Sequence, residues 1–177
     1  IMVGGYAINL HGYQRYTGDM DIWVEDSVTN RQNLRVAFVT CDMGDYSMLD
    51  RIQFVPGWTD FHLPNGIRLD IMVTMKGLEE YGFSECLEMA SIADIDGGKV
   101  PSLNINQLIA NKKAVNRPKD QIDVIELKKI KKLINLNEKE LQHATSPERQ
   151  ILLIQTHNHL KNMEIKITND MGMVISK

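Results

Sequence analysis

Residues 3–24 read VGGYAINLHGYQRYTGDMDIWV, and the order of features in this stretch decides how the chain folds. The apolar residues at its start predict the end of a buried strand over residues 1–3. Gly4 and Gly5 then form a turn, and residues 6–12 carry the apolar spacing of a short helix. Glycine lets the backbone approach a ligand closely, so this turn is a candidate phosphate-binding site. The alternative is a turn that contains glycine for conformational reasons alone.

Two aspartates lie inside the apolar run that ends this stretch. Asp19 and Asp21 are one residue apart in a strand predicted over residues 19–24. Because side chains two apart project from the same face of a strand, the two carboxylates share one face and the apolar residues occupy the other. Like charges repel, so a divalent cation is the usual reason to place two carboxylates together. A turn or a helix cap is the alternative, since Asp-x-Asp is also common there.

A third aspartate has the same setting in IRLDIMV, residues 67–73. The alternating apolar residues predict a strand, and Asp70 lies on the face opposite to them. A lone aspartate on a strand is more often an edge residue or the partner of a basic side chain. If this strand lies beside residues 19–24, however, Asp70 completes a set of three carboxylates. Such a set suits magnesium ions, and one member can accept a proton from an attacking hydroxyl group.

The remaining pattern predicts short strands and amphipathic helices without regular alternation. Helices are predicted over residues 29–39, 78–89, 105–114, 118–134 and 146–163, and strands over residues 51–55, 59–63, 92–95 and 99–103. Turn residues at 64–66 and 96–98 predict two hairpins, and the tail could turn at Asn169-Asp170 or be loose. This pattern indicates an α+β fold, in which helices pack on a small mixed β-sheet.

Charge is distributed unevenly along the chain. Residues 112–133 contain eight basic and three acidic residues, so this segment carries +5 and the rest of the chain −8. A basic segment on an acidic body indicates a local anionic partner such as a nucleotide or a nucleic acid. The alternative is a solvated helix face, which we favour on the charge run alone.

Length and composition fit one globular domain with a small appendage. No run of the 177 residues is apolar enough for a membrane span, and no signal peptide is visible. The two cysteines, Cys41 and Cys86, have no metal-site spacing, so free thiols and a cytoplasmic location are expected. The first residues are already strand-like, and we therefore expect an upstream element of the domain to precede them.

Asp123 interrupts the apolar side of the helix predicted from residue 118. Asp123, Leu127, Ile130 and Ile134 follow the spacing of one helix face, while most of the lysines lie on the other side. A charge on a packed face is costly unless it is paired. Asp123 is therefore either a functional residue near a nucleotide or a structural partner of Lys112 or Arg117.

Taken in order, these motifs resemble the active-site signature of the polymerase-beta-like nucleotidyltransferase superfamily. That signature is a Gly-Gly or Gly-Ser turn, a spacer, an Asp-x-Asp strand and a third acidic residue on a neighbouring strand. The later stretch LIANKKAVNRPKDQIDVIEL, residues 108–127, is similar to the closing motif of the bacterial AbiEii-type branch. The resemblance extends over residues 1–133. It implies a nucleotidyltransferase-like domain over residues 1–135 and leaves residues 136–177 as a helical extension of unknown role.

The resemblance also implies a role for each matching residue. Asp19, Asp21 and Asp70 would be catalytic and would bind Mg²⁺, with two ions expected and with Asp70 as the base. The residues implied in binding a nucleoside triphosphate are Gly4, Gly5, Thr17, Lys112, Lys119 and Asp123.

The sequence thus predicts a nucleotidyltransferase that moves a nucleoside monophosphate from a triphosphate to an acceptor hydroxyl. The acceptor could be an RNA, a protein or a small molecule. AbiEii-type relatives act as toxins of toxin–antitoxin pairs, so a toxin role and a cognate antitoxin protein are implied by the resemblance. Two alternatives stay open. One is a non-catalytic module of the same fold that binds a protein or a nucleic acid, and the other is a phosphoesterase that uses the same metals for hydrolysis.

Overall fold

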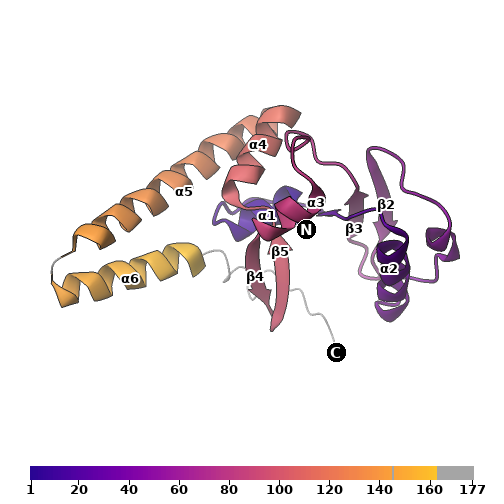
Figure 1. Cartoon of the computed structure of the whole chain (residues 1–177), viewed down its shortest axis with the longest axis horizontal. Coiled ribbons are helices and arrows are strands. Elements are labelled where there is room, and N and C mark those ends of the chain that lie inside the picture. The colour runs from indigo at the N-terminus through magenta and orange to yellow at the C-terminus, as the bar shows by residue number, and fades with distance from the viewer. Residues whose placement is uncertain (145, 163–177) are drawn as a thin grey trace.

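The computed structural model describes residues 1–144 and 146–162 (Figure 1). Its α-helices are α1 (Gly4–Leu10), α2 (Val28–Thr40), α3 (Phe83–Glu88), α4 (Ile105–Val115), α5 (Pro118–His143) and α6 (Pro147–Asn162), and a 3₁₀ helix, η1, covers Ser47–Asp50. The strands are β1 (Asp19–Trp23), β2 (Trp58–His62), β3 (Arg68–Met72), β4 (Ser91–Ile95) and β5 (Gly98–Ser102). Small sheets combined with helices in irregular order place the chain in the α+β class, as the sequence predicts.

Strand β3 is the centre of a three-stranded mixed sheet with the order β1-β3-β2. β1 runs parallel to β3, and Asp21 is paired with Asp70 in their register. β2 runs antiparallel to β3, as the predicted hairpin at residues 64–66 requires, and Asp60 is paired with Asp70. Because directly paired residues lie on the same face of a sheet, these three aspartates form one row across it.

β4 and β5 form a separate two-stranded sheet, which is the second predicted hairpin. Met2 joins the two sheets, because its N–H donates to the carbonyl of Pro101 at 2.7 Å and its own backbone forms a bridge to Ile22 of β1. The strand predicted over residues 1–3 is wrong. Met2 makes isolated bridges only, since the chain turns into α1 at Gly4.

The three-stranded sheet separates two hydrophobic cores. On one face, Leu69 and Ile71 of β3 pack with Phe38 of α2. On the other face, Trp23 packs with buried residues of α1, α4 and α5, which include Ile8, Leu108 and Leu127. Asp70 alternates with Leu69 and Ile71 along β3, so its carboxylate is on the second face, toward α1 and α4.

α5 is 26 residues long and extends away from the body of the protein, and α6 returns alongside it (Figure 1). The helix end predicted at residue 134 is wrong, because the helix continues to His143 without a proline or glycine after its first position. The boundary expected between residues 135 and 136 therefore lies within one helix, and the division of the chain there stays a prediction.

Two other predicted elements differ from the structure. The strand predicted over residues 51–55 is wrong, because the Ile52 N–H donates to the carbonyl of Met48 at 2.9 Å and the Phe54 N–H to Asp26 Oδ2 at 3.1 Å. The segment is consequently a loop that follows η1. The helix predicted over residues 78–89 begins only at Phe83, since Gly82 caps it by donating its N–H to the Glu85 carboxylate at 2.7 Å.

Several smaller expectations can also be compared with the structure. Among residues 1–144 and 146–162, no helix is long and apolar enough to cross a membrane. Both cysteines are free, with Cys41 exposed and Cys86 buried. The turn considered at Asn169-Asp170 lies outside the described residues.

Candidate metal and nucleotide site

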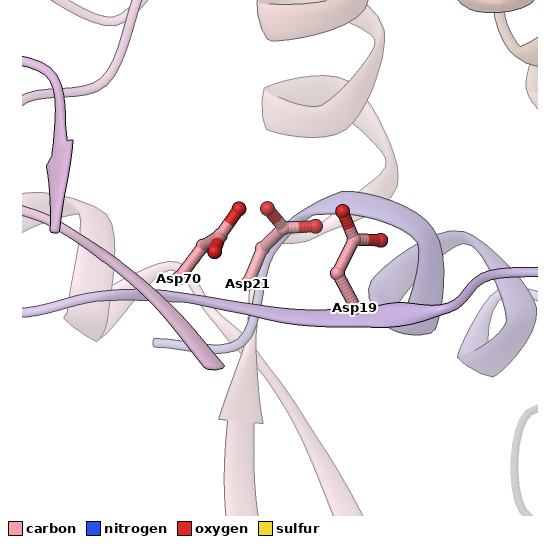
Figure 2. Close-up of side chains that lie close together, drawn as sticks. All are labelled: Asp19, Asp21 and Asp70. Atoms are coloured by element: carbon pink, nitrogen blue, oxygen red, sulfur yellow. The ribbon is translucent and has the colours of Figure 1, made fainter. Parts of the chain in front are cut away.

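Asp19, Asp21 and Asp70 converge on one point (Figure 2). Asp19 and Asp21 project from the same face of β1, and the parallel pairing with β3 places Asp70 beside Asp21. One carboxylate oxygen from each residue lies within 4.8 Å of the other two. The structure thus brings together the three carboxylates that the sequence singles out, and it does so on adjacent strands.

Gly4 and Gly5 form the backbone wall beside these carboxylates. α1 begins at Gly4, whose φ of +62° is a left-handed conformation that glycine adopts without strain. A Cβ atom at Gly4 would lie 1.8 Å from Asp21 Oδ2, and one at Gly5 would lie 2.2 Å from Thr17 Oγ1. The Gly5 N–H also donates a hydrogen bond to the Asp21 carboxylate. The absence of side chains at both positions therefore lets α1 approach β1 closely, and the glycines open the helix instead of forming a turn before it.

Burial and mutual repulsion act against the negative charge of this cluster. Burial, followed by the charges of Asp19 and Asp70, raises the pKa of Asp21 above its ordinary value, although Lys112 acts in the opposite direction. Burial likewise raises the pKa of Asp70, with Arg68 opposing it. A divalent cation between the carboxylates would favour their charged forms and offset both effects.

Arg68 supplies positive charge to the cluster. Its Nη2 donates to Asp19 Oδ2 at 2.9 Å and to Asp70 Oδ2 at 3.1 Å, and its Nε lies 2.9 Å from Asp70 Oδ1. Asp70 Oδ1 is buried and makes no hydrogen bond within the described part of the chain, although it forms this ion pair with Arg68 Nε. Three carboxylates with one oxygen each within 4.8 Å of the others form a donor set that fits a hard cation such as Mg²⁺.

A cleft with a volume of about 470 Å³ opens over the carboxylates. Of the residues expected to bind nucleotide, those that line it are Gly4, Gly5, Thr17, Lys112 and Lys119. Arginines that line the same cleft are Arg15, Arg68 and Arg117. Carboxylates on the floor of the cleft and cations around them form an arrangement that can hold phosphate groups together with a metal ion.

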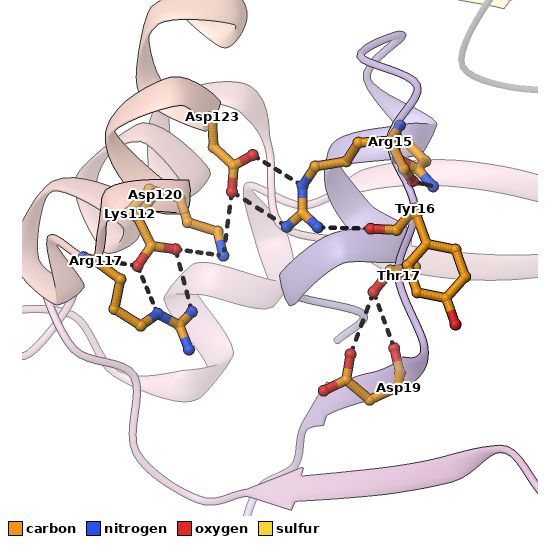
Figure 3. A network of polar contacts seen from close by, with 9 residues as sticks. Arg15, Tyr16, Thr17, Asp19, Lys112, Arg117, Asp120 and Asp123 are labelled. Atoms are coloured by element: carbon orange, nitrogen blue, oxygen red, sulfur yellow. Dashed lines mark hydrogen bonds and ion pairs between the residues drawn. The ribbon is translucent and has the colours of Figure 1, made fainter.

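A network of buried ion pairs supports one wall of this cleft (Figure 3). Lys112 Nζ lies 3.1 Å from Asp120 Oδ1 and 3.7 Å from Asp123 Oδ2. Arg117 Nε lies 2.7 Å from Asp120 Oδ2, and Arg15 Nε lies 2.8 Å from Asp123 Oδ1. Burial by itself would raise the pKa of Asp120, but the hydrogen bonds from Arg117 and the charge of Lys112 lower it to about 2. Asp120 is therefore held as a carboxylate by Arg117 and Lys112, and Asp123 is paired with Arg15 and Lys112.

Asp123 is buried, as its place in the apolar stripe predicts, with 1% of its surface exposed. It contacts Lys112, one of the two partners expected for a structural role, whereas Arg117 pairs with Asp120 instead. Asp123 is not among the residues that line the cleft. These contacts favour the structural alternative, in which Asp123 positions Lys112 and Arg15 at the wall of the cleft.

We expect Asp123→Asn to destabilise the protein by about 1–3 kcal/mol, because the amide leaves Arg15 without its buried negative partner and leaves Lys112 with Asp120 alone. Urea denaturation measures this change in the free energy of unfolding. Glu126→Gln is the matched control on the same helix, since the Glu126–Lys129 pair is largely exposed and should contribute less than about 1 kcal/mol. Equal stability of the two variants would show that the Asp123 pairs contribute nothing.

Three residues of the site are not among those that the sequence singles out. Arg68 could have been found, because it lies two residues before Asp70 and so shares its strand face. Arg15 could not, since it lies in the loop between α1 and β1 and meets α5 only through the fold. Trp58, which lines the cleft from β2, likewise depends on a strand order that the sequence does not reveal.

No model of a protein family matches the sequence, and no curated protein matches it significantly. A functional proposal therefore depends on the geometry of the cleft, together with the motif resemblance in the sequence.

Proposed function

We propose that this protein is a metal-dependent nucleotidyltransferase of the polymerase-beta-like type, which moves a nucleoside monophosphate from a triphosphate to an acceptor hydroxyl. The observation that carries the proposal is the convergence of Asp19, Asp21 and Asp70 within 4.8 Å, in a cleft that also contains the glycine pair. A module that only binds a partner has no need for three carboxylates at one point, because their repulsion costs stability.

The residues of the cleft divide into metal ligands and phosphate contacts. Asp19, Asp21 and Asp70 would hold Mg²⁺, which when bound neutralises phosphate charge and polarises the reacting phosphoryl group. Lys112 and Lys119 line the cleft and would bind the triphosphate oxygens. Positioning and neutralisation of charge account for most of the catalysis in such reactions.

Asp70 would act as the base. In the proposed reaction, the acceptor oxygen forms a bond to the α-phosphorus while the bond from that phosphorus to the pyrophosphate oxygen breaks. The hydroxyl proton passes to the Asp70 carboxylate, which stands beside the other two carboxylates at the point of reaction. Arg68 is 47% exposed and is therefore able to turn from the carboxylates toward a phosphate when a cation takes its place.

A toxin role is part of the proposal only through the motif resemblance of residues 108–127. It would add a cognate antitoxin protein as partner and would leave the chemistry of the cleft unchanged.

An assay with nucleoside triphosphates labelled at the α-phosphate, with Mg²⁺ and a short single-stranded RNA, tests the proposal. We expect labelled product on the RNA and release of pyrophosphate, and we expect a chelator to stop both. Release of labelled monophosphate without transfer would instead support a phosphoesterase. Retention of intact triphosphate on the protein without turnover, with RNA, protein and small alcohols each tried as acceptor, would support the non-catalytic module.

A further inference from the structure

The sheet face that carries the carboxylates continues past Asp70 onto the edge strand β2. In the antiparallel register, Asp60 is paired with Asp70 and Trp58 with Met72. Met72 and Trp58 both line the cleft, so the aromatic side chain of β2 is on the same face as the carboxylates. Among the described residues no strand pairs with the outer side of β2, so this flank of the cleft ends at a sheet edge.

Trp58 has the surroundings of a ligand-binding side chain and not those of a core residue. Its side chain is 67% exposed although it lines a cleft. The other tryptophan of the chain, Trp23, is 4% exposed and packs edge-on against Phe83 with ring centroids 5.2 Å apart. An indole face that is open to a cleft can stack on a planar aromatic ring such as a nucleobase.

We propose that this flank of the cleft is the acceptor subsite, and that it takes a terminal ribonucleoside whose base stacks on Trp58 and whose ribose hydroxyls donate to Asp60. This inference rests on the proposed nucleotidyltransferase function and names its acceptor class. Trp58 lines the cleft, and Asp60 lies beyond its lining, two residues further along the same strand and about 7 Å away, where it is paired with Asp70. That separation is comparable with the distance from the base of a nucleoside to its ribose hydroxyls.

The position of Asp70 assigns this flank to the acceptor and not to the triphosphate. Asp70 lies on β3, between Asp21 on β1 and Asp60 on β2. The glycine pair, Thr17 and the lysines lie on the β1 side, where α1, α4 and α5 meet the sheet. A triphosphate bound there leaves the β2 side of Asp70 for the group that gives up its proton.

The charge on this flank favours a terminal nucleoside over an internal one. Asp60 is exposed, and its negative charge is near enough to contribute to the raised pKa of Asp70. A phosphodiester placed beside these two carboxylates would be repelled, whereas ribose hydroxyls are donors that a carboxylate accepts. A chain end presents hydroxyls at the position where an internal nucleotide would present a phosphate.

Tryptophan fluorescence tests the binding step without any catalysis. Adenosine is titrated into the metal-free protein in the presence of a chelator, and we expect saturable quenching of the exposed indole. Trp58→Ala should abolish this quenching, because Trp23 is buried in the core. Asp60→Asn should weaken adenosine binding by about tenfold and leave dideoxyadenosine, which lacks the hydroxyls, unaffected.

Steady-state kinetics then test the subsite during transfer. Trp58→Ala should raise the KM for a short single-stranded RNA by roughly 5- to 150-fold and leave the KM for the triphosphate unchanged. Trp58→Phe should recover part of the loss, since a phenyl ring still stacks. Ile92→Ala is the matched control, because Ile92 is 57% exposed on β4 and does not line the cleft.

Failure of this inference can be told apart from failure of the proposed function. If transfer occurs but Trp58→Ala changes only the KM for the triphosphate, or changes neither KM, the subsite is wrong while the function stands. If the wild type shows no transfer to any acceptor, the function fails, and absence of adenosine quenching in the same protein then rejects the subsite as well. Quenching that Asp60→Asn weakens for adenosine alone supports the subsite in either case.

Discussion

Asp21→Asn is expected to reduce nucleotide transfer by about a thousandfold and to leave the protein folded and at least as stable as the wild type. Asp21 is the central carboxylate of the cluster, with Asp19 beside it on β1 and Asp70 beside it on β3. An amide is a poor ligand for Mg²⁺ in comparison with a carboxylate, so the loss should appear in metal binding before it appears in turnover. Calorimetric titration with Mn²⁺ and the transfer assay measure the two effects separately.

The expected sign of the stability change follows from the pKa of Asp21. Burial and the charges of Asp19 and Asp70 raise this pKa, so the native state disfavours the charged form relative to the unfolded chain. Asp21 therefore destabilises the metal-free fold at neutral pH. Its contribution to stability is most favourable in acid, at a pH below the pKa that Asp21 has in the unfolded chain. The neutral amide removes the repulsion and retains an oxygen that accepts the hydrogen bond from the Gly5 N–H.

Asp96→Asn is the matched control for this substitution. Asp96 is exposed in the turn between β4 and β5, and its φ of 50° is one that asparagine tolerates well. It should change neither transfer nor Mn²⁺ binding. Full transfer by Asp21→Asn would contradict the metal site and with it the proposed function.

The three carboxylates could be predicted because strands have a period of two. Asp19 and Asp21 share a face in any strand, and Asp70 alternates with apolar residues in a second strand whatever its neighbours are. The parallel pairing that brings the strands together could not be predicted. It depends on residues 25–67 crossing the sheet through α2 and the β2 hairpin, which is a non-local arrangement that local pattern does not encode.

The sequence prediction failed where contacts with other segments determine the backbone conformation. The apolar residues of segment 51–55 satisfy a strand pattern, but the backbone donors of this segment bond to Met48 and Asp26. The glycine pair was expected to leave room for phosphate. The structure adds that a side chain at Gly4 would collide with Asp21, so the same residue shapes the protein as well as the cleft.

The burial of Asp120 was not predicted from the sequence. The pattern of the helix pointed to Asp123 as the buried charge, yet Asp120 is wholly buried as well. Its two cations come from Lys112 on α4 and Arg117 at the start of α5, and the three residues lie close in sequence. The short connection between α4 and α5 is therefore closed by charge pairs in addition to the packing of Leu108 and Leu127.

Lys112→Met is expected to destabilise the protein by about 3–5 kcal/mol, the largest loss we expect from a single substitution at this wall of the cleft. Lys112 is 3% exposed, and its Nζ lies between Asp120 and Asp123, at 3.1 Å and 3.7 Å. Methionine fills a similar volume but removes the positive charge that these two carboxylates share. Each buried negative charge is then compensated by one arginine alone. Urea denaturation at neutral pH measures the loss.

The pH dependence of this loss separates a charge effect from a packing effect. The pKa of Asp120 is lowered from its ordinary 3.8 to about 2. Its ion pairs therefore stabilise the protein fully at a pH above 3.8, and this stabilisation is lost as the pH falls toward 2. The difference between wild type and Lys112→Met should therefore shrink over that interval. Lys113→Met is the matched control, since the neighbouring Lys113 is exposed and the same change should cost less than about 0.5 kcal/mol. A loss in Lys112→Met that stays constant as the pH falls would assign the effect to packing, and the charge network would then have no part in holding α4 against α5.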